Sequence, residues 1–488
     1  MRLKNIYFLR LLALIAVCLI SATVHAEDVF EVDGIYYKRI SLNEVEVTCN
    51  PAVLKLIGRN DTSDLNYNLY LWLYDDEELN TNNLDQLIKV TYKGNVVIPE
   101  SIFYRDFKFT VRSIGECAFA YSTAMNSVEI PNTVKKFGVY AFKGCTDLNS
   151  VTIPNSVTDI YGAFSGCTSL SSITIPNSVT NINEAFEGCT SLSSVTIPNS
   201  ITKIFLTFSG CTSLSSVTIP NSVTDISGAF WGCTSLSSVT IPNSVTNINT
   251  AFNGCTSLSS VTIPNSVTNI NYAFSGCTSL SSVTIPNSVT DIDGTFEDCT
   301  SLSSVIIPNS VKTINKKAFA GCSSLSNVSI PNSVNLIENK AFAGCSNLTN
   351  INIPNSVKLI GDGAFEACSS LRKISLSNSL HGIYENTFNG CTSLTSIVIP
   401  NSVVSIRHDA FAGCTSLTSI VIPNSVERIG SHAFDGCSSL TSIAIPNSVK
   451  NIDAYAFKNC VSLKSVTIPA MTKLYENPFP ETTKVIRR

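Results

Sequence analysis

A unit of 22 or 23 residues repeats from about residue 97 to the C-terminus, and this repeat constrains the fold more than any other feature of the chain. One copy, residues 188–200, reads Gly-Cys-Thr-Ser-Leu-Ser-Ser-Val-Thr-Ile-Pro-Asn-Ser. A unit this short cannot bury a core alone, so each copy must stack on its neighbours and share one apolar interior. The sequence therefore predicts a solenoid whose function depends on a surface and not on an enclosed pocket.

The phenylalanine of a recurrent Ala-Phe pair, replaced by Thr-Phe in a few copies, marks the period. Sixteen copies carry it, and Phe479 marks a degenerate last one: Phe119, Phe142, Phe164, Phe186, Phe208, Phe230, Phe252, Phe274, Phe296, Phe319, Phe342, Phe365, Phe388, Phe411, Phe434 and Phe457. The step is 22 residues from Phe142 to Phe296 and 23 between the other regular copies. The residue missing from the shorter copies lies between the core isoleucine and the phenylalanine, which predicts a tighter back side there.

Each copy contains the pattern of one short strand. Apolar and small polar residues alternate at the end of residues 192–197, so we expect Leu192, Val195 and Ile197 to point inward. Pro198 then ends the strand because it has no N–H group to donate. The Ala-Phe-x-Gly-Cys stretch predicts one helical or 3₁₀ turn that glycine terminates. Short parallel strands with helical turns behind them give an α/β solenoid.

The full pattern Leu-x-x-Ile-x-Ile-Pro-x-Ser-Val-x-x-Ile-x-x-x-Ala-Phe-x-Gly-Cys resembles the BspA-like leucine-rich repeat family, a bacterial class, over about four-fifths of the chain. The resemblance implies a right-handed arc of about 16–17 coils behind a small β-rich N-terminal cap. It also implies a secreted or cell-surface adhesin that binds host matrix proteins or other cells. An acidic, Asn-rich insert around Tyr67 to Asn83 departs from the commoner family arrangement.

Four segments are expected along the chain. Residues 1–26 have a basic start, an apolar stretch from Leu11 to Ile20 and the small-residue site Val24-His25-Ala26, the pattern of a secretory signal peptide. Residues 27–96 form a β-rich capping domain that contains a hairpin around Asp33-Gly34. Residues 97–470 form the solenoid and 471–488 a C-terminal cap. No other stretch reaches the apolar length that a membrane-spanning helix needs, so the mature chain is expected to be exported without a transmembrane segment.

The formal charge of −4 disfavours nucleic acid as a partner, because binding phosphates needs a basic face. The charge is unevenly distributed. Residues 143–300 hold two basic and nine acidic residues (net −7), whereas residues 301–488 hold sixteen basic and ten acidic ones (net +6). Two batches of duplicated repeats explain this asymmetry, and so does a polarity for binding.

Fifteen cysteines recur once per coil from Cys145 to Cys460. Cysteines of exported proteins usually form disulfides, but stacked side chains point in parallel and would have to twist to reach a bridge dihedral near 90°. The spacing therefore favours a ladder of buried, reduced thiols over disulfides. No Cys-x-x-Cys pair or Cys/His cluster favours zinc, and no cofactor is expected.

The sequence does not favour an enzyme. The predicted mature chain has only His381, His408 and His432, without a Ser-His-Asp arrangement, a phosphate-binding glycine loop or a pair of acidic residues typical of a catalytic site. His408 and His432 occupy comparable back positions one coil apart. A solvated pair is favoured there over a catalytic or metal site.

The outward positions of the strands hold the candidate binding site. Up to residue 284 they read Ser-Ser-x-Thr almost without change, a uniform surface that discriminates poorly between partners. Later coils place Arg372 and Lys373 on one strand and Val398, Val421 and Ala444 on the next three. A basic pair beside an apolar strip is typical of a protein-recognition patch, although drift among duplicated repeats produces the same pattern.

The sequence thus favours a secreted or cell-surface leucine-rich repeat protein, an adhesin or protein-binding scaffold that engages extracellular matrix or another cell surface. The main alternative is a structural spacer or variable surface antigen without a specific ligand site. Ice or crystal binding by the Ser-x-Thr rows is disfavoured, because curvature spoils lattice matching over many coils.

Overall fold

The computed structural model describes residues 29–52, 74–75, 78–79 and 91–488. The predicted signal peptide, residues 1–26, and most of the insert around Tyr67 to Asn83 lie outside the described residues. The chain forms two compact units that divide between Thr190 and Ser191, within the repeats.

The N-terminal unit begins with the predicted hairpin. β1 (Val29–Val32) and β2 (Ile35–Arg39) pair antiparallel, and Asp33 and Gly34 form the turn with φ of 52° and 80°. A sheet extends from this hairpin in the order β1-β2-β3-β8-β10, with β7 paired to β8. Its remaining strands are β3 (Glu44–Val47), β7 (Ser101–Tyr104), β8 (Phe107–Ile114) and β10 (Lys136–Phe137). The hairpin is confirmed, and its sheet is continuous with the first coils.

A second sheet of this unit is a parallel ladder that contains the strands of its first coils. It has the order β11-β9-β6, and both pairings are parallel. The strands of this unit outside the hairpin sheet are β4 (Tyr74–Asp75), β5 (Glu78–Leu79), β6 (Gly94–Val97), β9 (Met125–Glu129), β11 (Ser150–Val151) and β12 (Ser172–Thr174).

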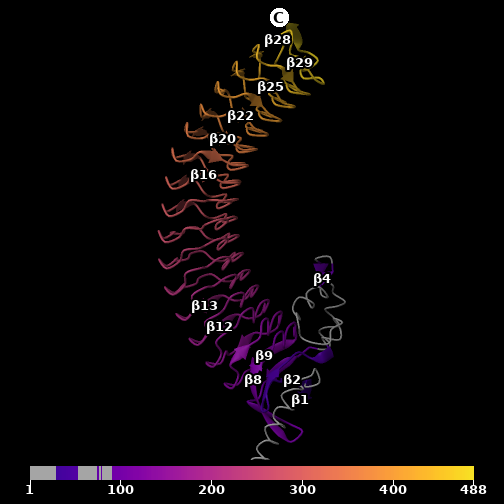
Figure 1. Cartoon of the computed structure of the whole chain (residues 1–488), viewed down its shortest axis with the longest axis vertical. Helices are drawn as coiled ribbons and strands as arrows, with labels where there is room; N and C mark the ends of the chain where they lie inside the picture. The colour runs from indigo at the N-terminus through magenta and orange to yellow at the C-terminus, as the bar shows by residue number, and fades with distance from the viewer. Residues whose placement is uncertain (1–28, 53–73, 76–77, 80–90) are drawn as a thin grey trace, which may run out of the picture. The chain divides into compact units, whose positions relative to one another are not determined.

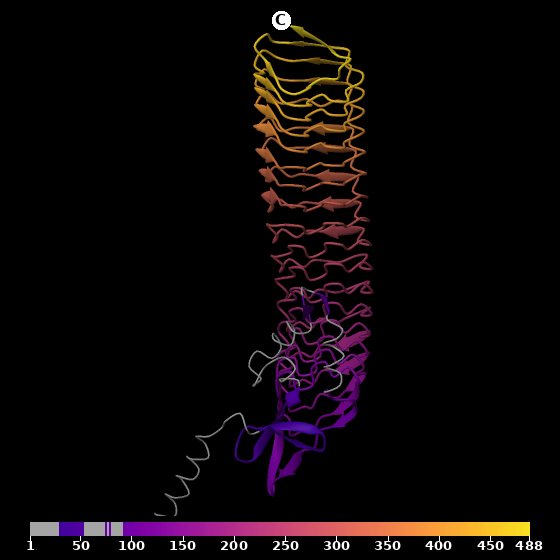
Figure 2. The same cartoon turned by 90° about the vertical axis from the view of Figure 1, so that its right-hand side faces the viewer.

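In the C-terminal unit the coils stack so that their strands form two series of parallel sheets and bridges, here called the first and second ladders (Figures 1 and 2). The first ladder contains β13 (Ser194–Thr196), β14 (Ser282–Thr284), β15 (Ser304–Ile306), β17 (Asn327–Ser329), β19 (Asn350–Asn352), β21 (Lys373–Ser375), β24 (Ser419–Val421), β26 (Ser442–Ala444), β28 (Ser465–Ile468) and β30 (Lys484–Arg487). The second contains β16 (Thr313–Ile314), β18 (Leu336–Ile337), β20 (Leu359–Ile360), β22 (Gly382–Ile383), β23 (Ser405–Ile406), β25 (Arg428–Ile429), β27 (Asn451–Ile452) and β29 (Lys473–Leu474). Figure 2 shows these ladders as two columns of arrows in the orange and yellow coils.

The second ladder distinguishes the two coil lengths. In the 23-residue coils its members are two-residue strands, such as β16 and β18, which pair at Thr313↔Leu336 and Ile314↔Ile337. In the 22-residue coils only isolated bridges form, such as Asp225↔Asn247. The residue that the shorter coils lack lies directly after this position. In the longer coils the additional residue therefore allows one more residue pair in the second ladder.

The interior follows the predicted pattern. Leu192, Val195 and Ile197 are all buried, and the phenylalanine of each coil is fully buried as far as Phe457. In the C-terminal unit the rings stack face to face from Phe208 to Phe479, with centroids 5.0–5.8 Å apart. Each ring thus contacts the coil before it and the coil after it, which makes the core a single column.

The predicted helical turn is wrong, and with it the α/β class. From residue 91 onward the structure contains strands, turns and bends but no helix. The N–H of Phe230 donates to Ala251 O of the next coil (2.9 Å), and that of Gly232 donates to Asn253 O (2.7 Å). Only the intervening N–H of Trp231 stays within its coil, donating three residues back. Because alternate N–H groups bond between coils, no run of i→i−4 bonds can form, and the fold is an all-β solenoid.

The cysteine ladder adds a further bond between coils. All cysteines of the described residues are buried free thiols. The Cys255 thiol donates to the Phe230 carbonyl of the preceding coil at 3.1 Å, and the same carbonyl accepts the N–H of Cys233 in its own coil at 3.0 Å. Burial raises the pKa of the Cys233 thiol to about 12. Burial raises the thiol pKa at most other ladder positions as well, so these thiols stay protonated and act as hydrogen-bond donors and not as nucleophiles.

Replacing Phe230 with Ala is expected to destabilise the stack by about 3–5 kcal/mol, because two neighbouring coils share the void. Limited proteolysis should show new cleavage confined to about residues 208–252, whereas the exposed substitution Thr240→Ala should give none. A cleavage map identical to that of the parent protein would contradict the stacking argument.

Iodoacetamide at pH 8 should leave the ladder thiols largely unmodified in the folded protein and label nearly all fifteen after denaturation without reductant. Mass spectrometry of protein exported from its native host gives the count. Fewer than about five labelled thiols in the denatured, unreduced sample would show that disulfides form in spite of the parallel stacking.

Candidate recognition surface

The outward residues of the first ladder in the C-terminal unit form one surface, here called the strand face. Each coil contributes three positions, which in the coil of β13 are Ser193, Ser194 and Thr196. These positions are exposed or half-exposed in every coil from there to β28, while the intervening Leu, Val or Ile points inward. Stacking aligns the same position of successive coils into columns that run along the solenoid.

The first part of the strand face carries only hydroxyl groups. Thr196, Thr218 and Thr240 form consecutive bridges in one column, and the pattern continues through Thr284. A shallow depression of about 460 Å³ lies over four of these coils and ends at Ile306, whose side chain is 72% exposed. Ile306 was not expected from the sequence, because it is a single apolar residue between Thr284 and Ser329 in the same column.

Val398, Val421 and Ala444 form one continuous strip, as their spacing suggested. Val398 bridges Val421, and Val421 is paired with Ala444 between β24 and β26. Val398 is 81% exposed and Val421 is 75% exposed. These three residues, here called the apolar strip, occupy the column that holds threonine in the first coils.

Arg372 and Lys373, here called the basic pair, are both exposed one coil before Val398. Their coil has lost the usual proline. Ser377 instead enters the core, where its hydroxyl donates to Val357 O at 2.6 Å. Within the described part of the chain, neither cation forms an ion pair. A second shallow depression, of about 500 Å³, extends from Lys373 across the preceding coils. Its polar lining consists of Asn327, Ser329, Asn350, Asn352, Lys373 and Ser375.

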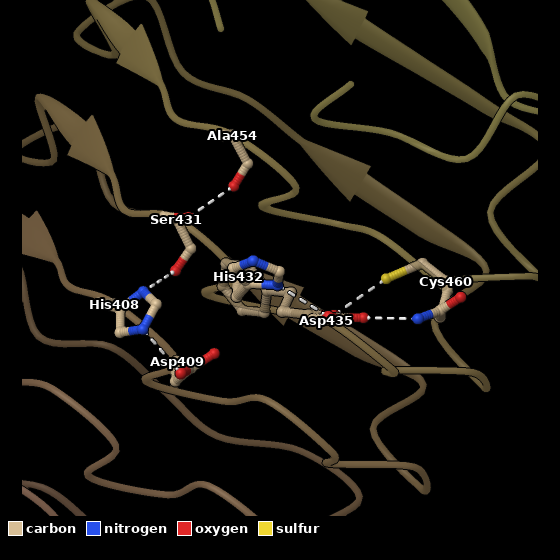
Figure 3. Close-up of polar contacts among 9 residues, drawn as sticks. His408, Asp409, Ser431, His432, Asp435, Ala454 and Cys460 are labelled. Carbon is tan, nitrogen blue, oxygen red and sulfur yellow. Dashed lines mark hydrogen bonds and ion pairs between the residues drawn. The ribbon is translucent and has the colours of Figure 1, made fainter. Parts of the chain in front are cut away.

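His408 and His432 lie next to each other on the back side, as expected (Figure 3). Their ring centroids are 5.8 Å apart and the rings are perpendicular. His408 Nδ1 donates to Ser431 O at 3.0 Å and its Nε2 lies 2.9 Å from the Asp409 carboxylate, while His432 Nδ1 lies 2.8 Å from Asp435. Across the described residues, no group of three or more His, Cys, Asp or Glu side chains is placed to hold a metal ion.

A depression of about 480 Å³ opens beside His408, and both arginines of its lining have partners. Arg428 Nε is 2.8 Å from the Asp453 carboxylate, and the Arg407 guanidinium covers the Tyr384 ring at 4.3 Å. Because both arginines already have partners, the back side is a weaker candidate than the strand face.

Trp231 was not singled out from the sequence. Trp231 is half-exposed on the back side of its coil, where the neighbouring 22-residue coils carry small polar residues. A comparison of every position between copies would have found both Trp231 and Ile306.

Among the residues that the structure describes, no helix has the length and apolar character needed to cross a membrane.

The combined variant R372S/K373S/V398T/V421T should fold normally, because all four side chains are exposed and none of the changed groups supports the core. Exposed substitutions of this kind usually change the free energy of unfolding by less than about 0.5 kcal/mol each. Urea unfolding followed by circular dichroism should give an unchanged slope and a midpoint close to that of the parent. A large loss of stability would mean that the strand face is structural.

Comparison with known proteins gives a consistent result. The model of the BspA type leucine rich repeat region (6 copies) matches residues 98–207, 184–295, 293–417 and 404–486. A leucine-rich repeat protein from Bacteroides ovatus is similar at 30% identity, covering 94% of this chain and 99% of its own, with a TM-score of 0.55. A leucine rich cell surface protein from Faecalibacterium prausnitzii is 28% identical over 85% of this chain and 94% of its own, with a TM-score of 0.44. None of the curated proteins matches the chain. The repeat model spans most of the chain, and the protein therefore belongs to the BspA-type leucine-rich repeat family.

Proposed function

We propose that this protein is an exported binding protein whose apolar strip and basic pair contact a protein partner. One observation carries the proposal: Val398 and Val421 are exposed on adjacent coils in a column where the first coils carry threonine. Exposed apolar side chains that adjoin in this way mark interaction surfaces, whereas single ones are ordinary on any protein.

The strand face suits recognition energetically. Fully burying a valine side chain is worth about 1.5–3 kcal/mol, and arginine is among the residues enriched at energetic centres of interfaces. Lys373 pairs with Asn350 of the preceding coil, Val398 bridges Val421, and Val421 pairs with Ala444, so binding would order only a few side chains. A rigid surface of this kind limits the entropy lost on association.

Export and adhesion are part of the proposal. The basic, apolar and small-residue segments of residues 1–26 are typical of a secretory signal peptide. Resemblance to BspA-like proteins supports a role at the cell surface or outside the cell, where an adhesin meets matrix proteins or other cells. The uniform hydroxyl coils favour the alternative of a structural spacer or variable antigen, because they offer length without a specific site.

The test is surface plasmon resonance of the mature protein against immobilised extracellular-matrix proteins. R372S/K373S/V398T/V421T should weaken binding to the recognised protein at least tenfold, because it removes both the apolar strip and the basic pair. The control variant T218S/T240S, in the uniform part of the strand face, should bind as the parent does. Unchanged affinity of the combined variant would place the site elsewhere, and a panel without any binder would favour the spacer.

A further inference from the structure

The strand face has a one-sided charge. From Ser193 to Ile486 its outward positions carry no carboxylate, although the chain as a whole has a net charge of −4. Its charged residues are Arg372, Lys373, Lys464 and Lys484, all of them cationic and exposed. The carboxylates of these coils lie in the back segments and connecting turns instead.

The four cations bracket the apolar strip. The basic pair lies one coil before Val398. Lys464 lies one coil after Ala444, because Ala444 of β26 is paired with Thr467 of β28, the strand that follows Lys464. Lys484 follows on the next strand, aligned with Ser465. The sequence assigned Lys484 to a C-terminal cap, and only the register of β28 with β30 places it on the strand face.

These cations lack carboxylate partners, whereas several cations elsewhere on the same coils have them. Arg428 pairs with Asp453 at 2.8 Å, and Lys450 pairs with Glu427 at 2.8 Å. On the strand face, Lys464 Nζ donates only to the Val461 carbonyl, at 3.0 Å. Among the described residues, none of the four strand-face cations has an ion pair. Their charge is therefore available to a partner.

Spacing along the solenoid fixes the size of a matching ligand. The coil of Arg372 and the coil of Lys464 are four steps apart, marked by Leu371, Leu394, Leu417, Leu440 and Leu463. At about 4.8 Å per step the two basic groups are about 19 Å apart. An extended peptide rises about 3.3 Å per residue, so about six residues span the apolar strip between them.

We propose that the strand face binds an extended acidic segment of a protein partner, with carboxylates at both ends of an apolar stretch of about six residues. This deepens the proposed function and rests on it. Carboxylates meet the unpaired cations at each end, and aliphatic side chains cover Val398 and Val421 between them. The apolar strip has no aromatic ring on which a base or a sugar could stack, which favours a peptide over nucleic acid or polysaccharide.

The probe is a fluorescein-labelled peptide, Glu-Glu-Val-Thr-Val-Thr-Val-Thr-Glu-Glu, titrated with mature protein and followed by fluorescence anisotropy. R372S/K373S and K464S/K484S should each weaken binding at least fivefold and reduce its dependence on salt between about 50 and 300 mM NaCl. V398T/V421T should weaken binding with the salt dependence unchanged. K450S, which removes a paired cation on the back side, is the matched control and should have no effect.

Several results would overturn the inference. They are the absence of binding by the glutamate-ended peptide, equal binding by a peptide with lysine at both ends, and an unchanged affinity in K464S/K484S. If hyaluronate bound more tightly than the peptide, and with the same affinity to V398T/V421T as to the parent, the ligand would be an acidic polysaccharide instead. A matrix protein that lost affinity for R372S/K373S/V398T/V421T but not for K464S/K484S would leave the proposed function standing and remove this inference alone.

Discussion

The hydrogen bonds between successive coils are the constraint on which the rest of this structure depends. A 22- or 23-residue coil has too little apolar surface to fold alone, and its back segment contains no helix to satisfy its own N–H groups. Donation from one coil to the next, as from Phe230 to Ala251, satisfies those groups and sets the spacing at which the phenylalanine rings stack. The thiol ladder uses the remaining acceptor capacity of the phenylalanine carbonyls. Every interior position is therefore fixed by contacts with neighbouring coils, and only the outward positions are free to vary.

Residue pattern predicted the interior well and the back segment badly. Leu192, Val195 and Ile197 could be assigned inward because the alternation of apolar and polar residues is local information. The Ala-Phe-x-Gly stretch looks locally like a helical turn, but its N–H groups find their acceptors 21 residues away, as from Phe230 to Ala251. That partner is not visible in a window of a few residues. Long-range pairing thus decided between two conformations that the local sequence does not distinguish.

On the strand face, too, some residues could be predicted from the sequence and others could not. The apolar strip could be predicted because its members recur at a constant step of 23 residues. Lys484 could not, because the last coil is irregular and only its pairing with Ser465 aligns it with Lys373 in the second outward column. Ile306 departs from the hydroxyl residues around it in its column and is found once each copy is compared position by position. The repeat pattern therefore predicts the column in which a residue lies. The charge of the whole strand face can be predicted only when the register of every strand is known.

The change of coil length between Phe296 and Phe319 has a consequence for folding. Nearly identical coils pack equally well in any order, so a chain made of them could slip by one whole coil and keep most of its bonds. Isolated bridges on the back of the shorter coils and paired strands on the back of the longer ones are not interchangeable. Where the two patterns meet, the Ile292 N–H donates to the Asn315 side chain at 3.3 Å, and a slip of one coil would bring a coil of the other length into this position. The junction therefore acts as a reference mark that fixes the alignment of the coils on both sides of it.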